Sequence, residues 1–412
     1  MAKSKAEVLA ERKAKQMAGA GAAGAEAARC IVEADRNGEL DVPRTSSIQP
    51  KFQKALSAIN AALVDREEEA ELVLTALIAN QHCLFVGPPG TAKSMVGEAV
   101  KDLIVGGKGC TIHCCKDTSR DAAFGPVKVS LLVKDIYERV LDGGAAGAHV
   151  LILEEVFKAG PAVLDMFLML MNERVYKEGV FETKCPLRHI LGVSNEWTPE
   201  GYEAGLGAFF DRFLFRKTVA YVNEDARRTL FSRAVSGTSF KPHFAEKVTV
   251  AELDEAHKQA RSLPWTNEAK MAMWEITKEL GKEGIQAGDR RMVLSFMAAR
   301  AFAYLHGAGQ VETEHLDVLR HVLWDDPQGQ PAKADKVIGK LANPLRAQLH
   351  GIMHQARDVV AKVDDLGTRI DKLGDLEGKL KVMKDCPAKV RAVSYVTSEL
   401  KKALMEKARI RS

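Results

Sequence analysis

A glycine-rich turn at residues 87–94 carries the residue types that bind phosphate groups. Its sequence, GPPGTAKS, follows the apolar run LFV and precedes a helical pattern. Glycines let backbone N–H groups approach phosphate oxygens, and the start of a helix attracts their negative charge. The lysine is placed to contact the β and γ phosphates, and the serine hydroxyl to bind Mg²⁺. The predicted nucleotide-binding residues are Gly87, Pro88, Pro89, Gly90, Thr91, Ala92, Lys93, Ser94 and Met95.

One residue of this turn departs from the usual G-x-x-x-x-G-K-S pattern. Ala92 stands where a glycine commonly precedes the lysine. Taken alone, the motif has an alternative interpretation as a chance turn between a strand and a helix. The nucleotide interpretation therefore depends on polar residues elsewhere in the chain.

Two adjacent carboxylates, Glu154 and Glu155, follow the continuously apolar run HVLIL. Such a run predicts a buried parallel strand, and ligands bind at the carboxyl ends of these strands. Beside a phosphate site, one carboxylate holds Mg²⁺ and the next polarises the attacking water. We expect Glu154 to bind the metal together with Ser94, and Glu155 to act as the catalytic base. The alternative is a pair of surface glutamates that cap the following turn.

Three further polar positions fit the same site. Asn195 follows a predicted strand and is suited to bind the attacking water or the γ phosphate, or else to cap a turn. Arg212 lies between aromatic residues, where it either packs or faces the nucleotide of a neighbouring subunit. Arg290 and Arg291 lie in the first turn of a helix predicted to begin at Asp289, and we expect this turn to face the nucleotide; ion pairs with nearby acids are the alternative. The expected catalytic residues are Lys93, Glu155, Asn195, Arg212 and Arg290.

Short apolar runs alternate with helical patterns between residues 83 and 220, as a parallel α/β sheet requires. Helical patterns precede this region at residues 49–80 and continue beyond residue 223. An open sheet of this kind brings the polar residues together, because parallel strands end at one edge. The predicted strands are residues 83–86, 110–115, 149–153, 189–194 and 214–220.

Seven cysteines without regular spacing favour a reducing compartment over a disulfide framework. Cys110, His113, Cys114 and Cys115 have the composition of a metal site. Adjacent ligands on a strand point to opposite faces, however. We therefore expect a buried strand here, with the small cysteine side chains packed as apolar residues.

The chain of 412 residues is too long for one core and predicts two or three domains. A net charge of +4 is small for this length and makes nucleic acid an unlikely partner. No run of eighteen apolar residues and no signal peptide is present, so we expect a cytoplasmic protein. The predicted divisions are an Ala-rich arm at 1–44, an α/β domain at 45–222, a helical lid at 223–328 and a helical tail at 329–412.

The tail has three predicted helical features. Residues 341–357 have the pattern of one helix. Apolar residues between positions 359 and 373 follow a four-three spacing that suits a coiled coil or an antiparallel hairpin. A last helix is expected at residues 388–410. Structural packing and a partner-docking arm are both open interpretations.

Taken together, these motifs resemble those of the AAA+ ATPases, and most closely the MoxR family and its RavA (regulatory ATPase variant A) group. The resemblance covers residues 45–328, and residues 124–140 correspond to the insertion that marks this clade. The motifs are GPPGTAKS at 87–94, AFGP at 123–126, LILEEVFKAGPAVLDMFLMLMNER at 151–174, SNE at 194–196, FDRF at 210–213, GDRR at 288–291 and LWDDPQ at 323–328.

The resemblance implies a P-loop NTPase core with a parallel sheet, followed by an all-α lid domain. It assigns residues 87–94 to Walker A and residues 151–155 to Walker B, with Glu155 as the catalytic glutamate. Asn195 matches sensor 1, Arg212 the arginine finger supplied to an adjacent subunit, and Arg290 the sensor 2 of the lid, with Arg291 as the second choice. These assignments imply a homo-oligomeric ring, most simply a hexamer, that uses ATP and Mg²⁺.

The expected function is an ATPase ring that remodels or matures a partner protein. In this family the partner often contains a von Willebrand factor A (vWA) domain. Glu154 stands where the family usually has aspartate, and a carboxylate displaced by about 1 Å can change a rate about a hundredfold. An ATP-gated assembly scaffold with little hydrolysis is therefore the alternative. A nucleic-acid motor is a weaker alternative, because no DNA-binding motif is recognisable.

Overall fold

The computed structural model describes residues 47–134, 136–178, 181–197, 207–363, 365–383 and 387–411. The predicted arm at 1–44 lies outside these residues. The α-helices are α3 (Gln49–Ala62), α4 (Glu67–Ile78), α5 (Lys93–Leu103), α6 (Arg120–Phe124), α7 (Val129–Leu132), α8 (Pro161–Glu173), α10 (Gly207–Asp211), α11 (Glu224–Ser236), α12 (Val250–Arg261), α13 (Asn267–Lys282), α14 (Asp289–Leu305), α15 (Gln330–Ala342), α16 (Pro344–Lys362), α17 (Leu366–Lys381) and α18 (Pro387–Arg411). The 3₁₀ helices are η1 (Ala145–Gly147), η2 (Val156–Lys158) and η4 (Thr313–His321). The strands are β1 (His82–Val86), β2 (Ile104–Val105), β3 (Gly109–His113), β4 (Val150–Glu154), β5 (Val175–Glu178), β6 (Phe181–Lys184), β7 (His189–Ser194), β8 (Phe213–Thr218) and β9 (Val248–Thr249).

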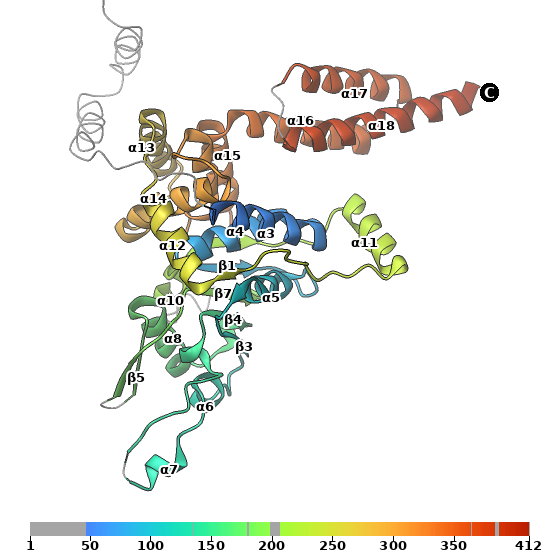
Figure 1. Cartoon of the computed structure of the whole chain (residues 1–412). Helices are drawn as coiled ribbons and strands as arrows, with labels where there is room; N and C mark the ends of the chain where they lie inside the picture. The colour runs from blue at the N-terminus through green and yellow to red at the C-terminus, as the bar shows by residue number, and fades with distance from the viewer. Residues whose placement is uncertain are drawn as a thin grey trace, which may run out of the picture.

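A five-stranded sheet at the centre of the molecule has the order β3-β4-β7-β1-β8 (Figure 1). All neighbouring strands in it are parallel, which confirms the predicted α/β core. The register pairs His113 with Glu154, and Val86 with Ser194. The carboxyl ends of these strands therefore lie along one edge, where the predicted site residues follow them.

Strand β3 corrects one prediction. Residues 110–115 do not form a buried strand, because β3 is the edge strand of this sheet and ends at His113. Ile112 and Cys114 are buried, whereas Cys115 is exposed. An edge strand has a neighbour on one side, so part of its length stays in solvent. Among the described residues, no group of His, Cys, Asp and Glu side chains is arranged to hold a metal ion.

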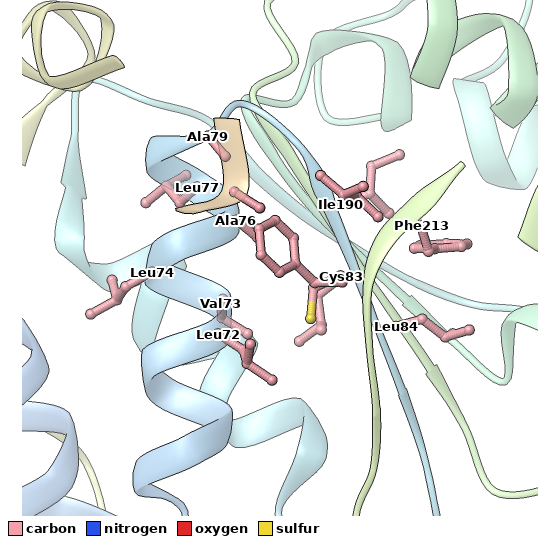
Figure 2. Close-up of a cluster of buried hydrophobic side chains, with 14 of the residues drawn as sticks. Leu72, Val73, Leu74, Ala76, Leu77, Ala79, Cys83, Leu84, Ile190 and Phe213 are labelled. Carbon is pink, nitrogen blue, oxygen red and sulfur yellow. The ribbon is translucent and has the colours of Figure 1, made fainter. Parts of the chain in front are cut away.

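Helix α4 packs its apolar side against the sheet, as Figure 2 shows. Its first turn holds three glutamates, which suit the positive end of the helix dipole. Burial of one leucine side chain contributes about 1.5–3 kcal/mol to the free energy of unfolding. Because α4 buries several apolar side chains in this cluster, its packing holds β1, and with it the start of the following loop, in place. The side chains labelled in the cluster are Leu72, Val73, Leu74, Ala76, Leu77, Ala79, Cys83, Leu84, Ile190 and Phe213.

A helical body built from α12 to α15 and η4 lies beside the sheet (Figure 1). Helix α14 begins at Asp289, as the sequence predicts. It packs against α4, α12, η4 and β8. The first turn of α14 is therefore held in a fixed place relative to the parallel sheet.

Helices α16, α17 and α18 project from the rest of the chain and share a small apolar core (Figure 1). The predicted single helix at 341–357 is wrong, because α15 ends at Ala342 and α16 begins at Pro344. Proline lacks an N–H and clashes with the preceding turn, so it starts a new helix here. The predicted seam at 359–373 is divided between α16 and α17, which pack against each other. Over the described part of the chain, every helix is too short or too polar to cross a lipid bilayer.

Candidate active site

The predicted phosphate-binding turn connects β1 to α5. The Gly87 N–H donates to the carbonyl oxygen of Ser194 at 3.1 Å. A Cβ atom at Gly87 would lie 2.0 Å from the Val219 carbonyl oxygen, so only glycine fits there. Gly90 has a φ of +75°, a conformation that favours glycine. The turn is thus a close backbone cradle, as phosphate binding requires.

Ala92 keeps this cradle without a glycine. Its φ of 61° and ψ of 21° lie in the left-handed region, immediately before the first residue of α5. Holding an L-residue there costs about 1–2 kcal/mol. The sequence departure therefore places backbone strain in the turn, immediately before α5.

Arg66 donates hydrogen bonds to the turn, and the sequence did not predict this contact. Its Nε donates to the Thr91 carbonyl oxygen at 2.8 Å, and its Nη2 to that of Ala220 at 2.9 Å. The side chain is 5% exposed. Arg66 precedes a run of three glutamates, and this local sequence carries no signal of a contact with the turn.

The ammonium group of Lys93 lies inside the cradle. It donates to the carbonyl oxygens of Gly87 at 2.6 Å and Pro88 at 2.7 Å. Burial lowers the pKa of Lys93, and the nearby charge of Glu155 partly opposes this change. The structure therefore places a buried cation where a phosphate chain would enter the turn.

Asn195 connects Lys93 to Glu155. Its Oδ1 accepts a hydrogen bond from Lys93 Nζ at 3.1 Å, and its Nδ2 donates to Glu155 Oε1. Glu155 has a left-handed backbone, with a φ of 53°. Its Oε2 is buried and lies 3.2 Å from the Lys158 ammonium, in a geometry that forms no hydrogen bond. One oxygen of the predicted catalytic base is thus oriented and the other lacks a hydrogen-bond donor among the described residues.

Glu154 lies beside this group, at the end of β4. Its Oε2 is 2.6 Å from Nδ1 of His113 on the neighbouring strand. The predicted metal ligands are the Glu154 carboxylate and the Ser94 hydroxyl at the start of α5. Both are hard oxygen donors, the ligand type that Mg²⁺ prefers. These residues fit the ion, although the contact with His113 was not predicted.

The two predicted arginines lie together, away from the group around Lys93. Arg290 is exposed, and its Nη2 donates to Asn172 Oδ1 at 3.2 Å. Asn172 is near the end of α8, roughly 17 Å along the helix axis from the end near Glu155. Partial desolvation lowers the pKa of the Arg290 side chain, and the nearby charge of Arg212 lowers it further.

Arg212 and Arg290 have different surroundings from Arg291, the second choice for sensor 2 in the lid. Arg212 Nη1 is 3.3 Å from Asp211 Oδ2, and its Nε is buried without a hydrogen-bond partner among the described residues. Arg291 is 2% exposed and pairs with Asp211 and Asp325. The ion-pair interpretation therefore applies to Arg291, whereas the first turn of α14 presents Arg290 to the far end of α8.

Comparison with known proteins identifies the family. Residues 50–258 match the family model of the MoxR domain in the MoxR-vWA-beta-propeller ternary systems. Residues 268–337 match the model of an AAA lid domain. The chain belongs to the MoxR family of AAA+ ATPases. The predicted fold, a parallel α/β core with a helical lid, is confirmed.

Several relatives support this membership. The uncharacterized protein MJ0079 of Methanocaldococcus jannaschii is 34% identical over 282 residues, which cover 68% of this chain and 72% of that protein. Chaperone MoxR1 of Mycobacterium tuberculosis is 25% identical over 184 residues, or 44% of this chain and 48% of that one. The crystal structure of a presumed ATPase from Cytophaga hutchinsonii has the same fold, with a TM-score of 0.58 at 17% identity, over 72% of this chain and 95% of that one.

Proposed function

We propose that this chain forms a ring, most simply a hexamer, in which ATP hydrolysis drives the remodelling or maturation of a partner protein. One observation carries the proposal: Lys93, Asn195 and Glu155 form one hydrogen-bonded group, while Arg212 and Arg290 lie together elsewhere. A site that needs both groups is completed when the arginines of one protomer approach the Lys93 group of the next.

The residues of the Lys93 group have separate tasks in this proposal. Phosphate oxygens that enter the cradle replace the loop carbonyls of Gly87 and Pro88 as partners of the Lys93 ammonium. Glu155 accepts a proton from the attacking water, and Asn195 orients its carboxylate. Ser94 and Glu154 would hold Mg²⁺, which would supply positive charge to neutralise the phosphates.

The arginines have the complementary task. Arg212 and Arg290 stabilise the negative charge that develops on the γ phosphate of the adjacent protomer. An arginine of this kind contributes about 10³–10⁵-fold to the turnover rate in other nucleotide hydrolases. We propose that the division into an α/β domain at 45–222 and a lid at 223–328 lets the two bodies change their relative angle during the cycle.

The matched family supports a proposal for the partner protein. The matched family model describes MoxR domains that work in ternary systems with vWA and beta-propeller proteins. We propose a partner with a vWA domain, in the cytoplasm, with the tail at 329–412 as a second contact region. The motifs of the chain resemble the RavA group most, and nucleic acid is not the expected substrate.

A substitution of the catalytic base tests the proposal. Glu155→Gln removes the proton acceptor but keeps the shape of the side chain. We expect turnover of Mg-ATP to fall by about 10²–10⁴-fold, with ATP binding unchanged. Phosphate release and a fluorescent-nucleotide titration measure the two quantities.

The matched control is Glu196→Gln, because Glu196 is an exposed carboxylate one residue beyond Asn195. It should leave both quantities unchanged. Equal turnover in Glu155→Gln and the unmodified chain would contradict the assignment of the base.

A second candidate function is an ATP-gated scaffold that scarcely hydrolyses ATP. The contact between Glu154 and His113 favours it, because it engages the expected metal ligand at 2.6 Å. The same assay separates the two functions. Tight ATP binding without phosphate release from the unmodified chain supports the scaffold.

A further inference from the structure

Three motifs of the chain each contain a charged residue to which the proposed chemistry assigns no task. They are Asp211 in FDRF, Arg291 in GDRR and Asp325 in LWDDPQ. The structure brings all three together with Arg216 of β8, and we call these four residues the charge node. Asp211 and Arg216 belong to the α/β sheet region, whereas Arg291 and Asp325 belong to the helical body.

Arg291 lies between two carboxylates. Its Nη2 donates to Asp211 Oδ1, and its Nη1 is 3.1 Å from Asp325 Oδ1. The same Nη1 donates to the Trp324 carbonyl oxygen at 2.9 Å. Both charged partners of Arg291 thus come from segments far from it in the sequence.

Arg216 makes a parallel set of contacts. Its Nη1 donates to Asp325 Oδ1 at 3.1 Å and to the Trp324 carbonyl oxygen at 2.6 Å. Its guanidinium lies 3.7 Å from the centre of the Phe210 ring. Arg216 is 1% exposed and Arg291 is 2% exposed. Two buried guanidinium groups with bonds in several directions hold a precise geometry, since planar forks tolerate little rotation.

The node is joined through the chain to Arg290, which is exposed, and to Arg212, which is partly buried. Asp211 precedes Arg212, and Arg291 follows Arg290. Consecutive Cα atoms are about 3.8 Å apart, so Arg212 and Arg290 cannot change their separation without displacing the node. The ion pair between Asp211 and Arg291 therefore connects the backbones of both arginines.

We propose that the charge node positions Arg212 and Arg290 as one unit, so that both reach the nucleotide of the neighbouring protomer together. The inference rests on the proposed function, because it needs a site shared between protomers. Asp211, Arg216, Arg291 and Asp325 are positioning residues in this account. They act through the two arginines and touch no substrate.

Asp325→Asn tests the role of the node. The substitution removes a charge from both buried arginines and keeps the size of the side chain. We expect the turnover number to fall about tenfold to a hundredfold, the size of effect that displacement by about 1 Å produces. The affinity for ATP should not change, since the Lys93 group is not in contact with Asp325. Asp326→Asn is the control, because Asp326 is the exposed neighbour and should show full turnover.

Mixed rings distinguish positioning from a general loss of structure. Protomers with Glu155→Gln carry an intact node and intact arginines but a dead site of their own. Mixed with Asp325→Asn protomers, they should restore turnover at the Asp325→Asn sites. In a background of Arg212→Ala and Arg290→Ala, Asp325→Asn should cause no further loss.

Each outcome decides the matter. Restored turnover with no further loss in the arginine-free background supports the node. Rescue of Arg212→Ala by Glu155→Gln protomers, without rescue of Asp325→Asn, would overturn the node and leave the shared site standing. Failure of both mixtures would instead overturn the proposed function. A turnover number of Asp325→Asn equal to that of Asp326→Asn would also overturn the node.

Discussion

Two residues of the candidate site hold a left-handed backbone, Ala92 with a φ of 61° and Glu155 with a φ of 53°. Each such residue costs about 1–3 kcal/mol and persists only where the surroundings enforce it. At Ala92 the closed turn and the Arg66 contact with Thr91 enforce it. At Glu155 the hydrogen bond to Asn195 accompanies it. The backbone at both positions therefore lowers the stability of the fold, as is common for residues at functional sites.

Relief of the strain at Ala92 gives a prediction at this scale. Ala92→Gly should raise the free energy of unfolding by about 1 kcal/mol, because glycine adopts a positive φ without a steric cost. Urea denaturation measures the change. Ala61→Gly, at an exposed position within α3, should change the stability by about 1 kcal/mol in the opposite direction. A loss of stability in both variants would contradict the strain at Ala92.

The sequence predicts some of these residues and not others. Lys93, Glu155 and Asn195 come after predicted parallel strands, whose carboxyl ends lie along one edge of a sheet, so the sequence predicts that they meet. Arg66 reaches the turn from 25 positions before Thr91, and His113 reaches Glu154 through strand register. Contacts of this second kind depend on how elements pack. No local pattern predicts them.

At the scale of elements, the apolar runs predict all five strands of the central sheet. The mixed sequence of β3, GCTIH, differs from the continuously apolar VLILE of β4 and fits an edge position, but the order of the strands in the sheet depends on how the elements pack. The helix at 341–357 was predicted from apolar spacing, whereas the structure follows Pro344. Where apolar spacing predicts a continuous helix across a proline, the proline determines where one helix ends and the next begins.

The first residue of β7 gives a prediction about pH. His189 is fully buried, its Nδ1 is 2.8 Å from the Gln81 carbonyl oxygen, and its Nε2 has no hydrogen-bond partner among the described residues. Burial lowers the pKa of His189 to about 4. The pKa in an unfolded chain is about 6.5, so the unfolded state binds more protons between these values. Stability should therefore fall as the pH falls from 6.5 towards 4.

Urea denaturation at pH 7 and pH 5 tests this element. His189 should account for about 2 kcal/mol of the loss in unfolding free energy between the two pH values. His189→Gln keeps a donor for the Gln81 carbonyl and cannot titrate, so its loss should be smaller by that amount. The same pH dependence in both proteins would contradict a lowered pKa of His189 in the folded state.

At the scale of the whole molecule, one protomer carries the residues of the proposed site in two places. The Lys93 group lies at the carboxyl edge of the sheet, and Arg212 and Arg290 lie near the end of α8. The charge node ties the second group to both the sheet and the helical body. In the proposed ring of identical protomers, the two groups meet once per interface. Membership of the MoxR family agrees with this arrangement.

Mixing two inactive variants tests the shared site most directly. Arg212→Ala protomers keep their base but lack the arginine for a neighbour, and Glu155→Gln protomers have the reverse defect. Each variant alone should release almost no phosphate. The two folded variants are mixed in equal amounts and allowed to exchange protomers. The mixture should regain roughly a quarter of the unmodified rate, because a quarter of random interfaces pair an intact base with an intact arginine. No recovery in mixtures shown by light scattering to co-assemble would contradict the account.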